Sequence, residues 1–176
     1  IGTVLADDPS LTIKSANRIA ERVRNEKPEH PVRIVVDSQA RTPPDAKILH
    51  KGSGLRIIAV SLAAPEENIS ALKNHAEIIQ AGEVTVDLPV LLTKLAEKGI
   101  KRLMVEGGGT LIWGMLSAGL VDELTMFVGN IIIGGKDAPT LADGTGYVLE
   151  SDFPVLERMD VIPMEEGVLI HWKVRK

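Results

Sequence analysis

The chain has 176 residues, of which 44% are apolar, 25% are charged and none is cysteine, with a formal net charge of −4. This composition is ordinary for one globular domain, and it excludes wholesale disorder, disulfides and thiolate metal sites. The mild acidity and the lack of a basic run argue against a nucleic-acid partner, because such binding needs Lys and Arg to neutralise phosphates.

Short β-branched runs alternate with amphipathic stretches in the first two thirds of the chain. Strands are predicted at 32–37, 56–60, 76–80 and 101–105, and helices at 66–75 and 89–98. Because the strands are apolar on both faces and helices separate them, we expect an α/β fold with a mainly parallel central sheet flanked by helices. Asp87 is placed to cap the second of these helices and Gly99 to end it.

The last third of the chain changes to an antiparallel pattern. Extended segments are predicted at 121–128, 130–133, 155–164 and 168–174. A tight-turn signature, Glu165-Glu166-Gly167, separates the last two and predicts an antiparallel C-terminal hairpin. Residues 14–31 are expected to form a polar connection with a short helix.

Nothing in the sequence indicates a membrane partner, a secretion signal or a metal site. The longest uncharged stretch, 107–121, is shorter than the roughly 18 apolar residues that a span needs. The four histidines show no paired ligand spacing. A cytoplasmic protein without a bound metal is therefore expected.

The strongest local motif is Glu106-Gly107-Gly108-Gly109-Thr110, which lies between a predicted strand and a helix beginning near Leu111. Glycines let the backbone approach a ligand closely, and the free N–H groups of a helix N-terminus attract phosphate. The motif is neither the dinucleotide fingerprint G-x-G-x-x-G nor a P-loop. It indicates either a pyrophosphate cradle, with Glu106 where α/β sheets bind ligands, or a tight turn without a ligand.

Three further segments each have a functional and a structural interpretation. Asp7-Asp8-Pro9 is typical of an Asx turn or a helix cap, but one carboxylate could instead point into a site. Residues 37–44 follow a predicted strand and form either a ligand contact or a surface turn. Gly134-Gly135-Lys136 is either a second phosphate-proximal turn or a bulge in the antiparallel part.

Three ordered motifs together resemble one known family. GTVLADDPSLT at 2–12, VRIVVDSQARTP at 32–43 and LMVEGGGTLIWGMLSAGLVDEL at 103–124 resemble the reductases of riboflavin biosynthesis, and IIIGGKDAPTLADGTG at 131–146 fits the same pattern. The resemblance extends to the reductase half of the bacterial bifunctional deaminase–reductase. The motifs favour the archaeal stand-alone type of the family, which acts on 2,5-diamino-6-(ribosylamino)-4(3H)-pyrimidinone 5′-phosphate.

The resemblance implies a dihydrofolate-reductase-like fold and a homodimer that reduces the ribosyl side chain at C1′ to ribityl with NADPH, or in some members NADH. Cofactor contacts are implied at Thr3, Asp7, Asp37, Ser38, Gln39, Ala40, Gly82, Glu83, Gly107, Gly108, Gly109 and Thr110. Substrate contacts are implied at Leu11, Lys14 and Glu106, although bacterial members usually have Arg where Lys14 stands. Asp7 and Glu106 are the expected catalytic residues, with Asp7 assisting protonation and Glu106 holding the substrate.

Members of the family normally have a further strand and helix before the first motif. We therefore expect residues 1–176 to form a single reductase domain that lacks this N-terminal part. Three other functions stay open at this point. They are a dihydrofolate or pteridine reductase, which would share the fold, a nucleotide-binding module without catalysis, and a purely structural dimer without cofactor affinity.

Overall fold

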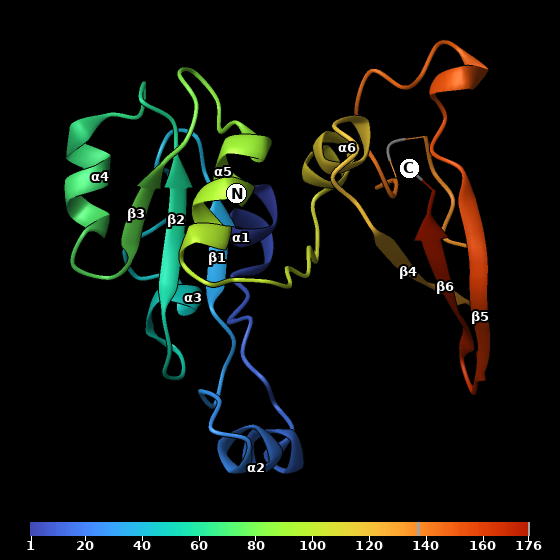
Figure 1. The fold of residues 1–176 in the computed structure, drawn as a ribbon, viewed down its shortest axis with the longest axis horizontal. Helices are drawn as coiled ribbons and strands as arrows, with labels where there is room; N and C mark the ends of the chain where they lie inside the picture. The colour runs from blue at the N-terminus through green and yellow to red at the C-terminus, as the bar shows by residue number, and fades with distance from the viewer. Residues whose placement is uncertain (137, 176) are drawn as a thin grey trace. The chain divides into compact units, whose positions relative to one another are not determined.

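The computed structural model describes residues 1–136 and 138–175. The chain forms two compact units, Ile1–Met104 and Val105–Lys176 (Figure 1). The first unit contains a parallel sheet and the second an antiparallel sheet. Whether the two units act as the single domain expected from the sequence stays a prediction.

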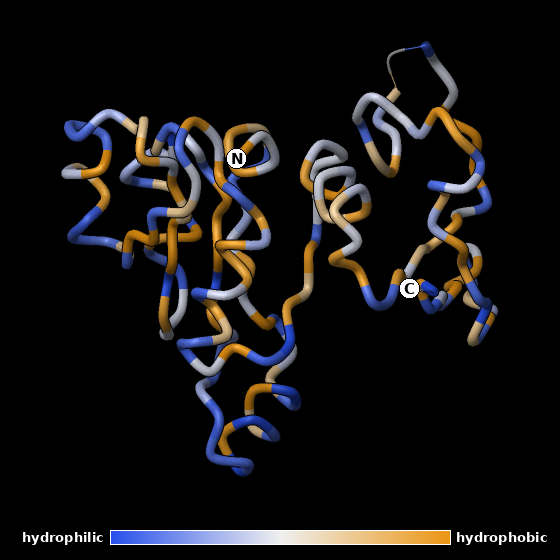
Figure 2. The backbone as a smooth tube through the Cα atoms, turned by 45° about the horizontal axis from the view of Figure 1, so that its top comes forward, coloured by the Kyte–Doolittle hydropathy of each residue, from blue (hydrophilic) through white to orange (hydrophobic). Residues whose placement is uncertain are grey.

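The parallel sheet consists of β1 (Arg33–Val36), β2 (Arg56–Val60) and β3 (Glu77–Gln80), in the order β1-β2-β3. In the register of the sheet, Val35 pairs with Ile58, and Ile58 pairs with Ile78. Ile57 and Ile58 of the central strand are buried on opposite faces, as the apolar run predicted. Figure 2 shows the hydrophobic residues concentrated in the strands of this sheet.

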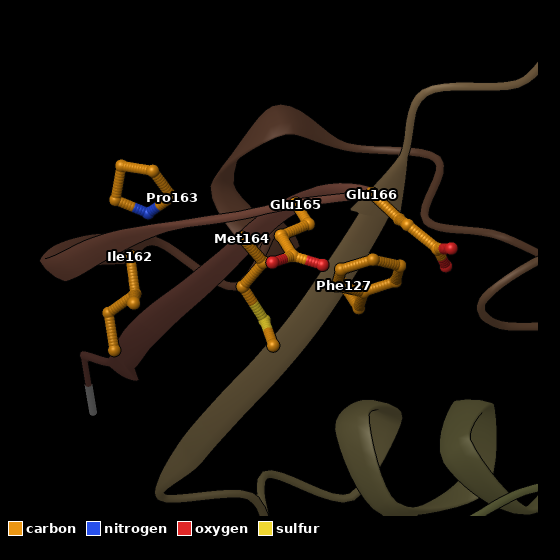
Figure 3. A pocket seen from close by; sticks show the side chains of 6 residues that line it. All are labelled: Phe127, Ile162, Pro163, Met164, Glu165 and Glu166. Atoms are coloured by element: carbon orange, nitrogen blue, oxygen red, sulfur yellow. The ribbon is translucent and has the colours of Figure 1, made fainter.

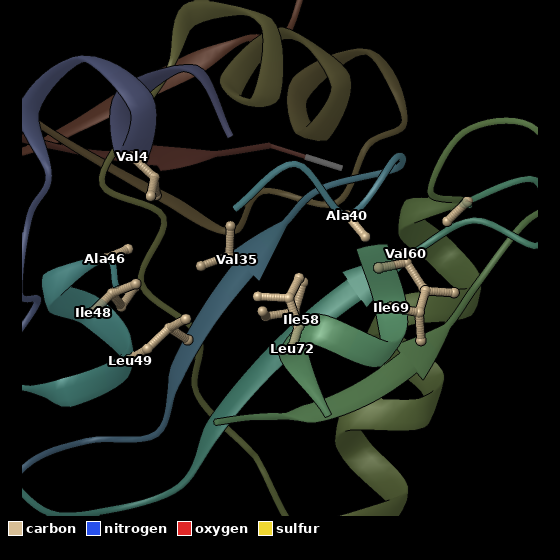
Figure 4. Packing of buried hydrophobic residues seen from close by; sticks show 11 residues of the cluster. Val4, Val35, Ala40, Ala46, Ile48, Leu49, Ile58, Val60, Ile69 and Leu72 are labelled. Carbon is tan, nitrogen blue, oxygen red and sulfur yellow. The ribbon is translucent and has the colours of Figure 1, made fainter. Parts of the chain in front are cut away.

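Five helices accompany the parallel sheet. They are α1 (Gly2–Asp7), α2 (Ala16–Arg24), α3 (Lys47–His50), α4 (Glu66–Leu72) and α5 (Leu88–Glu97). Side chains of α3 and α4 pack with Ile58 on one face of the sheet (Figure 4), and Leu91 and Leu95 of α5 pack with Ile57 on the other. The expected cap is confirmed, because Asp87 Oδ1 accepts a hydrogen bond of 2.9 Å from the Val90 N–H at the start of α5.

In its described residues, 105–136 and 138–175, the second unit contains α6 (Gly109–Ser117), the short 3-10 helix η1 (Glu150–Asp152) and three strands. The strands are β4 (Glu123–Gly129), β5 (Leu156–Met164) and β6 (Gly167–Val174), in the order β4-β6-β5. The predicted hairpin is confirmed as the antiparallel pair β5 and β6, joined at Glu165 and Glu166. The hairpin pairs with β4 through β6 in a three-stranded antiparallel sheet.

Two segments that were predicted to be extended are not strands. Residues 101–105 have no regular structure, and Met104 is 77% exposed. Residues 130–133 follow the end of β4, and Ile132 is 99% exposed. Strand propensity depends on pairing, because a strand needs a neighbour for its backbone groups, and neither segment has that neighbour in the described part of the chain.

Several local features of the structure refine the expectations. Gly134 and Gly135 lie outside the described strands with φ of +68° and +104°, so they are not a bulge within a strand. The short helix expected within 14–31 is α2, whereas α1 and α3 were not predicted because each spans fewer than two turns. None of the helices in residues 1–136 and 138–175 is long and apolar enough to cross a membrane.

Candidate functional site

The carboxyl ends of β1, β2 and β3 lie along one edge of the parallel sheet, where polar loops follow the strands. Ser38, just after β1, links these loops. Its carbonyl oxygen accepts hydrogen bonds from the backbone N–H of Ser61 (3.1 Å) and from the Ser61 hydroxyl (2.8 Å), just after β2. Its hydroxyl accepts a third bond of 3.0 Å from the Val86 N–H. The loops are therefore fixed relative to one another at the edge where α/β sheets bind ligands.

The loop after β3 is held to the loop after β2 by its backbone. The N–H groups of Leu62 and Ala63 donate to the carbonyl oxygens of Gly82 and Glu83, each at 2.9 Å. Gly82 has a φ of +88°, and a Cβ atom there would overlap the Thr85 carbonyl oxygen. Only glycine fits this position without displacing the loop. Gly82 and Glu83 therefore lie at the same sheet edge as Ser38, as the expected cofactor groove requires.

Asp37 supports its loop from inside. Its side chain is fully buried, and its Oδ2 accepts hydrogen bonds from the Thr42 N–H (2.7 Å) and the Thr42 hydroxyl (2.8 Å). Ala40 closes the turn with a φ of +53° and an N–H bond of 3.0 Å to the Asp37 carbonyl. The buried carboxylate therefore shapes the loop, in which Ser38 and Gln39 are partly exposed.

Asn68 and Thr42 support this edge, and the sequence analysis did not single them out. Asn68 Nδ2, on α4, donates to the Gln39 carbonyl oxygen at 3.1 Å. Asn68 and Gln39 are 29 positions apart. A contact over that sequence distance has no local signal, so only the folded chain could identify it.

The predicted residues of the first motif lie on α1 and on the segment that follows it. Thr3 and Asp7 are four positions apart on α1 and so share one helix face. Asp8 ends the helix in a left-handed conformation, with its N–H bonded to the Val4 carbonyl at 3.1 Å. The helix-cap interpretation of the paired aspartates is therefore confirmed for Asp8, at the C-terminal end of α1.

The glycine motif forms the start of α6 in the second unit. Gly107 and Gly108 have φ of +153° and +75°, and the Gly108 carbonyl accepts hydrogen bonds from the N–H groups of Leu111 and Ile112, both at 3.0 Å. No side chain within the described residues caps this helix. The first N–H groups of a helix lack partners inside it, so this turn has donors for an anion.

Asp143 lies against the same turn. A Cβ atom at Gly109 would overlap the Asp143 carboxylate, so the carboxylate is packed on the glycine backbone. The Thr140 hydroxyl donates a hydrogen bond to Asp143 Oδ1. The sequence analysis did not identify Asp143, although Asp143 and Gly109 both belong to motifs that it quoted. A negative charge at this position opposes the binding of a phosphate.

The predicted residues thus fall into groups within each unit. In the first unit, one sheet edge is lined by Asp37, Ser38, Gln39, Ala40, Gly82 and Glu83. The helix α1 and the segment that follows it carry Thr3, Asp7, Leu11 and Lys14. In the second unit, Glu106, Gly107, Gly108, Gly109 and Thr110 form the turn before α6 and its first residues. Asp7, Lys14 and Glu106 are exposed.

The second unit also has an open pocket of about 540 Å³ beside the β5–β6 turn (Figure 3). It is lined by Phe127, Ile162, Pro163, Met164, Glu165 and Glu166. None of the residues that the sequence analysis proposed for cofactor or substrate lines it. Within the described residues, no group of three or more His, Asp or Glu side chains could hold a metal ion.

Comparison with known proteins gives matches over most of the chain. The model of the RibD C-terminal domain family matches residues 1–169. The chain is 46% identical over 159 residues to the 2,5-diamino-6-ribosylamino-4(3H)-pyrimidinone 5′-phosphate reductase of Archaeoglobus fulgidus, covering 90% of this chain and 72% of that protein. It is 42% identical over 175 residues to the protein of the same name from Methanothermobacter thermautotrophicus, covering 99% and 77%.

Solved structures show the same fold. A pyrimidine reductase-like protein from Corynebacterium diphtheriae matches 99% of this chain and 73% of its own, with a TM-score of 0.80 and 15% identity. The riboflavin biosynthesis reductase of Saccharomyces cerevisiae matches 99% and 72%, with a TM-score of 0.69 and 20% identity. These matches confirm the expected α/β, dihydrofolate-reductase-like class of fold.

Proposed function

Because the chain belongs to the RibD C-terminal domain family, we propose that it is the reductase of riboflavin biosynthesis that acts on 2,5-diamino-6-(ribosylamino)-4(3H)-pyrimidinone 5′-phosphate. The observation that carries this proposal is the 46% and 42% identity to two archaeal proteins of that name, over 90% and 99% of this chain. The product is the corresponding ribityl compound.

In this proposal the reductant is NADPH, which when bound supplies the hydride that reduces C1′ of the ribosyl group. Two features of the chain fit such a cofactor. The turn at Gly107–Thr110 has helix N-terminal donors for a pyrophosphate, and Gly82 keeps the edge of the parallel sheet free of a side chain. Ser38 and Gln39 supply polar groups at that edge.

The roles of five further residues are those that the family resemblance implies, and the chemistry of each side chain suits its role. Lys14 is an exposed cation and pairs with the substrate phosphate. Glu106 accepts hydrogen bonds from the substrate, and Leu11 contacts it through its side chain. Thr3 and Asp7, on one face of α1, contact the nicotinamide end of the cofactor, where Asp7 assists protonation of the substrate.

An assay with two candidate substrates tests the proposal. The protein should oxidise NADPH in the presence of the pyrimidine phosphate and leave it unchanged with dihydrofolate, as followed by nicotinamide absorbance. Oxidation of NADPH with dihydrofolate, but not with the pyrimidine phosphate, would support a pteridine reductase instead. Calorimetric binding of NADPH without oxidation would support a non-catalytic nucleotide-binding module. If neither binding nor oxidation occurs, the proposal is wrong.

Asp7→Asn tests the proton-assisting role. The substitution removes the ionisable group and keeps its shape, so we expect kcat to fall about tenfold or more, equivalent to about 1.4 kcal/mol, with little change in the KM for the pyrimidine. Glu106→Gln is the comparison, and it should mainly raise the KM for the pyrimidine. A kcat for Asp7→Asn within about twofold of the wild type across the pH range would exclude Asp7 as the acid.

A further inference from the structure

The segment from Asp8 to Lys14 has an unusual backbone. Asp8 and Leu11 have φ of +43° and +48°, and neither is glycine. Leucine is rarely found in the left-handed region, and such a conformation persists only where the surroundings hold it. Leu11 packs against the first core cluster, which accounts for part of this support. Polar contacts at the two ends of the segment add to this support.

The first end of the segment is held by Asp8. Its Oδ1 accepts a hydrogen bond of 2.7 Å from the Lys47 N–H at the start of α3, and its Oδ2 lies 3.2 Å from the Lys47 ammonium. One lysine therefore binds both carboxylate oxygens, through its backbone and through its side chain. Charge-assisted hydrogen bonds of this kind are stronger than neutral ones.

The second end of the segment is held by His30. The Ile13 N–H donates to His30 Nδ1 at 3.3 Å, across 17 positions of the chain. His30 is buried, with only 8% of its surface exposed. In this contact the imidazole Nδ1 accepts the hydrogen bond from the backbone.

A loop held by arginines packs against His30. A Cβ atom at Gly52 would lie 2.6 Å from His30 Nε2, so this glycine lets the backbone lie directly on the imidazole ring. The carbonyl oxygens of the loop accept hydrogen bonds from two guanidinium groups. Arg33, which is 2% exposed, donates to Ser53 at 3.0 Å, and Arg56 donates to Gly52 at 2.5 Å. These contacts hold the loop, and the loop holds His30.

We propose that His30 is a positioning residue for substrate binding, which holds Leu11 and Lys14 in place through the Ile13 N–H. Asp8 holds the other end of the same segment on α3. The inference rests on the proposed function, because it takes Leu11 and Lys14 as substrate contacts. It adds a role for a histidine that touches neither ligand and acts only through the backbone.

Three variants of the full encoded protein test this role. His30→Leu removes the acceptor for the Ile13 N–H. His30→Asn keeps an acceptor, because the Asn Oδ1 stands at the same distance along the side chain as Nδ1. His75→Leu is the matched control, the same substitution at a half-buried histidine of the same unit outside the proposed site. Two quantities are measured, the KM values for both substrates and the hydrogen exchange of the Ile13 amide.

We expect His30→Leu to raise the KM for the pyrimidine phosphate about tenfold, equivalent to about 1.4 kcal/mol, with the KM for NADPH within about twofold. His30→Asn should restore the pyrimidine KM to within about threefold of the wild type, and His75→Leu should leave it unchanged. The inference is overturned if Asn does not restore the KM, or if both substrates are affected equally.

The exchange measurement separates this inference from the proposed function. His30→Leu should accelerate exchange of the Ile13 amide, and His30→Asn should slow it again, whether or not the protein reduces the pyrimidine. If the wild-type protein has no reductase activity, the proposed function is wrong. The exchange rates of the Ile13 amide would still show whether His30 accepts its hydrogen bond. Equal exchange in the wild type and in His30→Leu would overturn the contact itself.

Discussion

At the scale of single residues, the environment of each carboxylate decides its role in this chain. Asp37 is fully buried, and its Oδ2 accepts two hydrogen bonds from Thr42 that fix the loop after β1, whereas its Oδ1 has no hydrogen-bond partner within the described residues. Asp8 is partly exposed and binds Lys47 by both oxygens. Asp143 lies against the glycine turn before α6.

Asp8 should make the stability of the protein depend on pH. The backbone N–H of Lys47 is the main cause that lowers the pKa of Asp8, with the Lys47 ammonium adding to it. A lowered pKa in the folded state stabilises the protein above the unfolded value, near pH 4, and this contribution is lost as the pH falls through the folded value. Asp8→Asn should therefore lower Tm at neutral pH, with a difference that shrinks on acidification.

Thermal unfolding followed by circular dichroism from neutral to strongly acidic pH checks this expectation. Glu97→Gln is the control, because Glu97 is an exposed carboxylate at the last position of α5. A Tm difference between the wild type and Asp8→Asn that stays constant with pH would contradict the role of the Asp8 charge.

Asp143→Asn should strengthen NADPH binding if the pyrophosphate binds at the turn before α6. A unit charge about 4 Å from an anion costs about 1 kcal/mol in water, so removing it should tighten the Kd about fivefold. The gain should shrink at high salt, because salt screens exposed charges. Calorimetry at two salt concentrations measures both effects, with Glu150→Gln on η1 as the control. Unchanged affinity would place the pyrophosphate elsewhere.

At the scale of elements, the functional loops depend on close backbone contacts. The turn after β3 needs glycine at position 82, because the Thr85 carbonyl occupies the space of a side chain. At Gly109, the first residue of α6, a Cβ atom would overlap the Asp143 carboxylate, so a side chain there would displace Asp143. In both cases, the glycine of a loop that is proposed to bind the cofactor lies in close contact with another residue of the chain. Substitution of such a glycine should therefore change both stability and binding.

Gly82→Ala should destabilise the protein more than Gly99→Ala does. Both glycines have a left-handed φ, +88° and +79°, but a Cβ atom at Gly99 meets nothing within 4 Å. Gly99→Ala should therefore cost only the backbone term, about 1–2 kcal/mol. Gly82→Ala should cost about 1–3 kcal/mol beyond that, because the overlap forces the loop to move. Urea denaturation gives both values, and equal losses would show that the loop accommodates the methyl group.

At the scale of the whole molecule, the second unit exposes apolar side chains along β5. Met159, Val161 and Met164 are 58%, 42% and 53% exposed. Large exposed apolar patches on a protein surface mark interaction sites. The homodimer that the family resemblance implies stays a prediction.

Sedimentation analysis tests the homodimer and the part that β5 has in it. We expect a dimer for the wild type and a shift towards the monomer for Val161→Lys, because a lysine does not tolerate burial without a partner. Asp160→Lys introduces the same side chain one residue away, at a position that is already charged, and should remain dimeric. A monomeric wild type, or equal behaviour of the two variants, would contradict the expectation.

The sequence by itself determined the features that depend on neighbouring residues. These include the three strands of the parallel sheet, the cap of α5 by Asp87 and the turn at Glu165 and Glu166. Residue periodicity and caps act within a few positions, so they can be recognised without a fold. The motifs also identified the family, and they placed the expected cofactor residues at the loops after β1 and β3.

Only the tertiary structure decided the features that need a partner from far along the chain. Residues 101–105 have strand-like side chains but form no strand, because pairing requires a neighbour that their own residues do not encode. The hydrogen bond from the Val86 N–H to the Ser38 hydroxyl spans 48 positions, and no local pattern predicted it. The contact between His30 and Ile13 spans 17 positions and left no pattern in the sequence. Such contacts depend on which surfaces meet when the core packs, and local propensity does not contain that information.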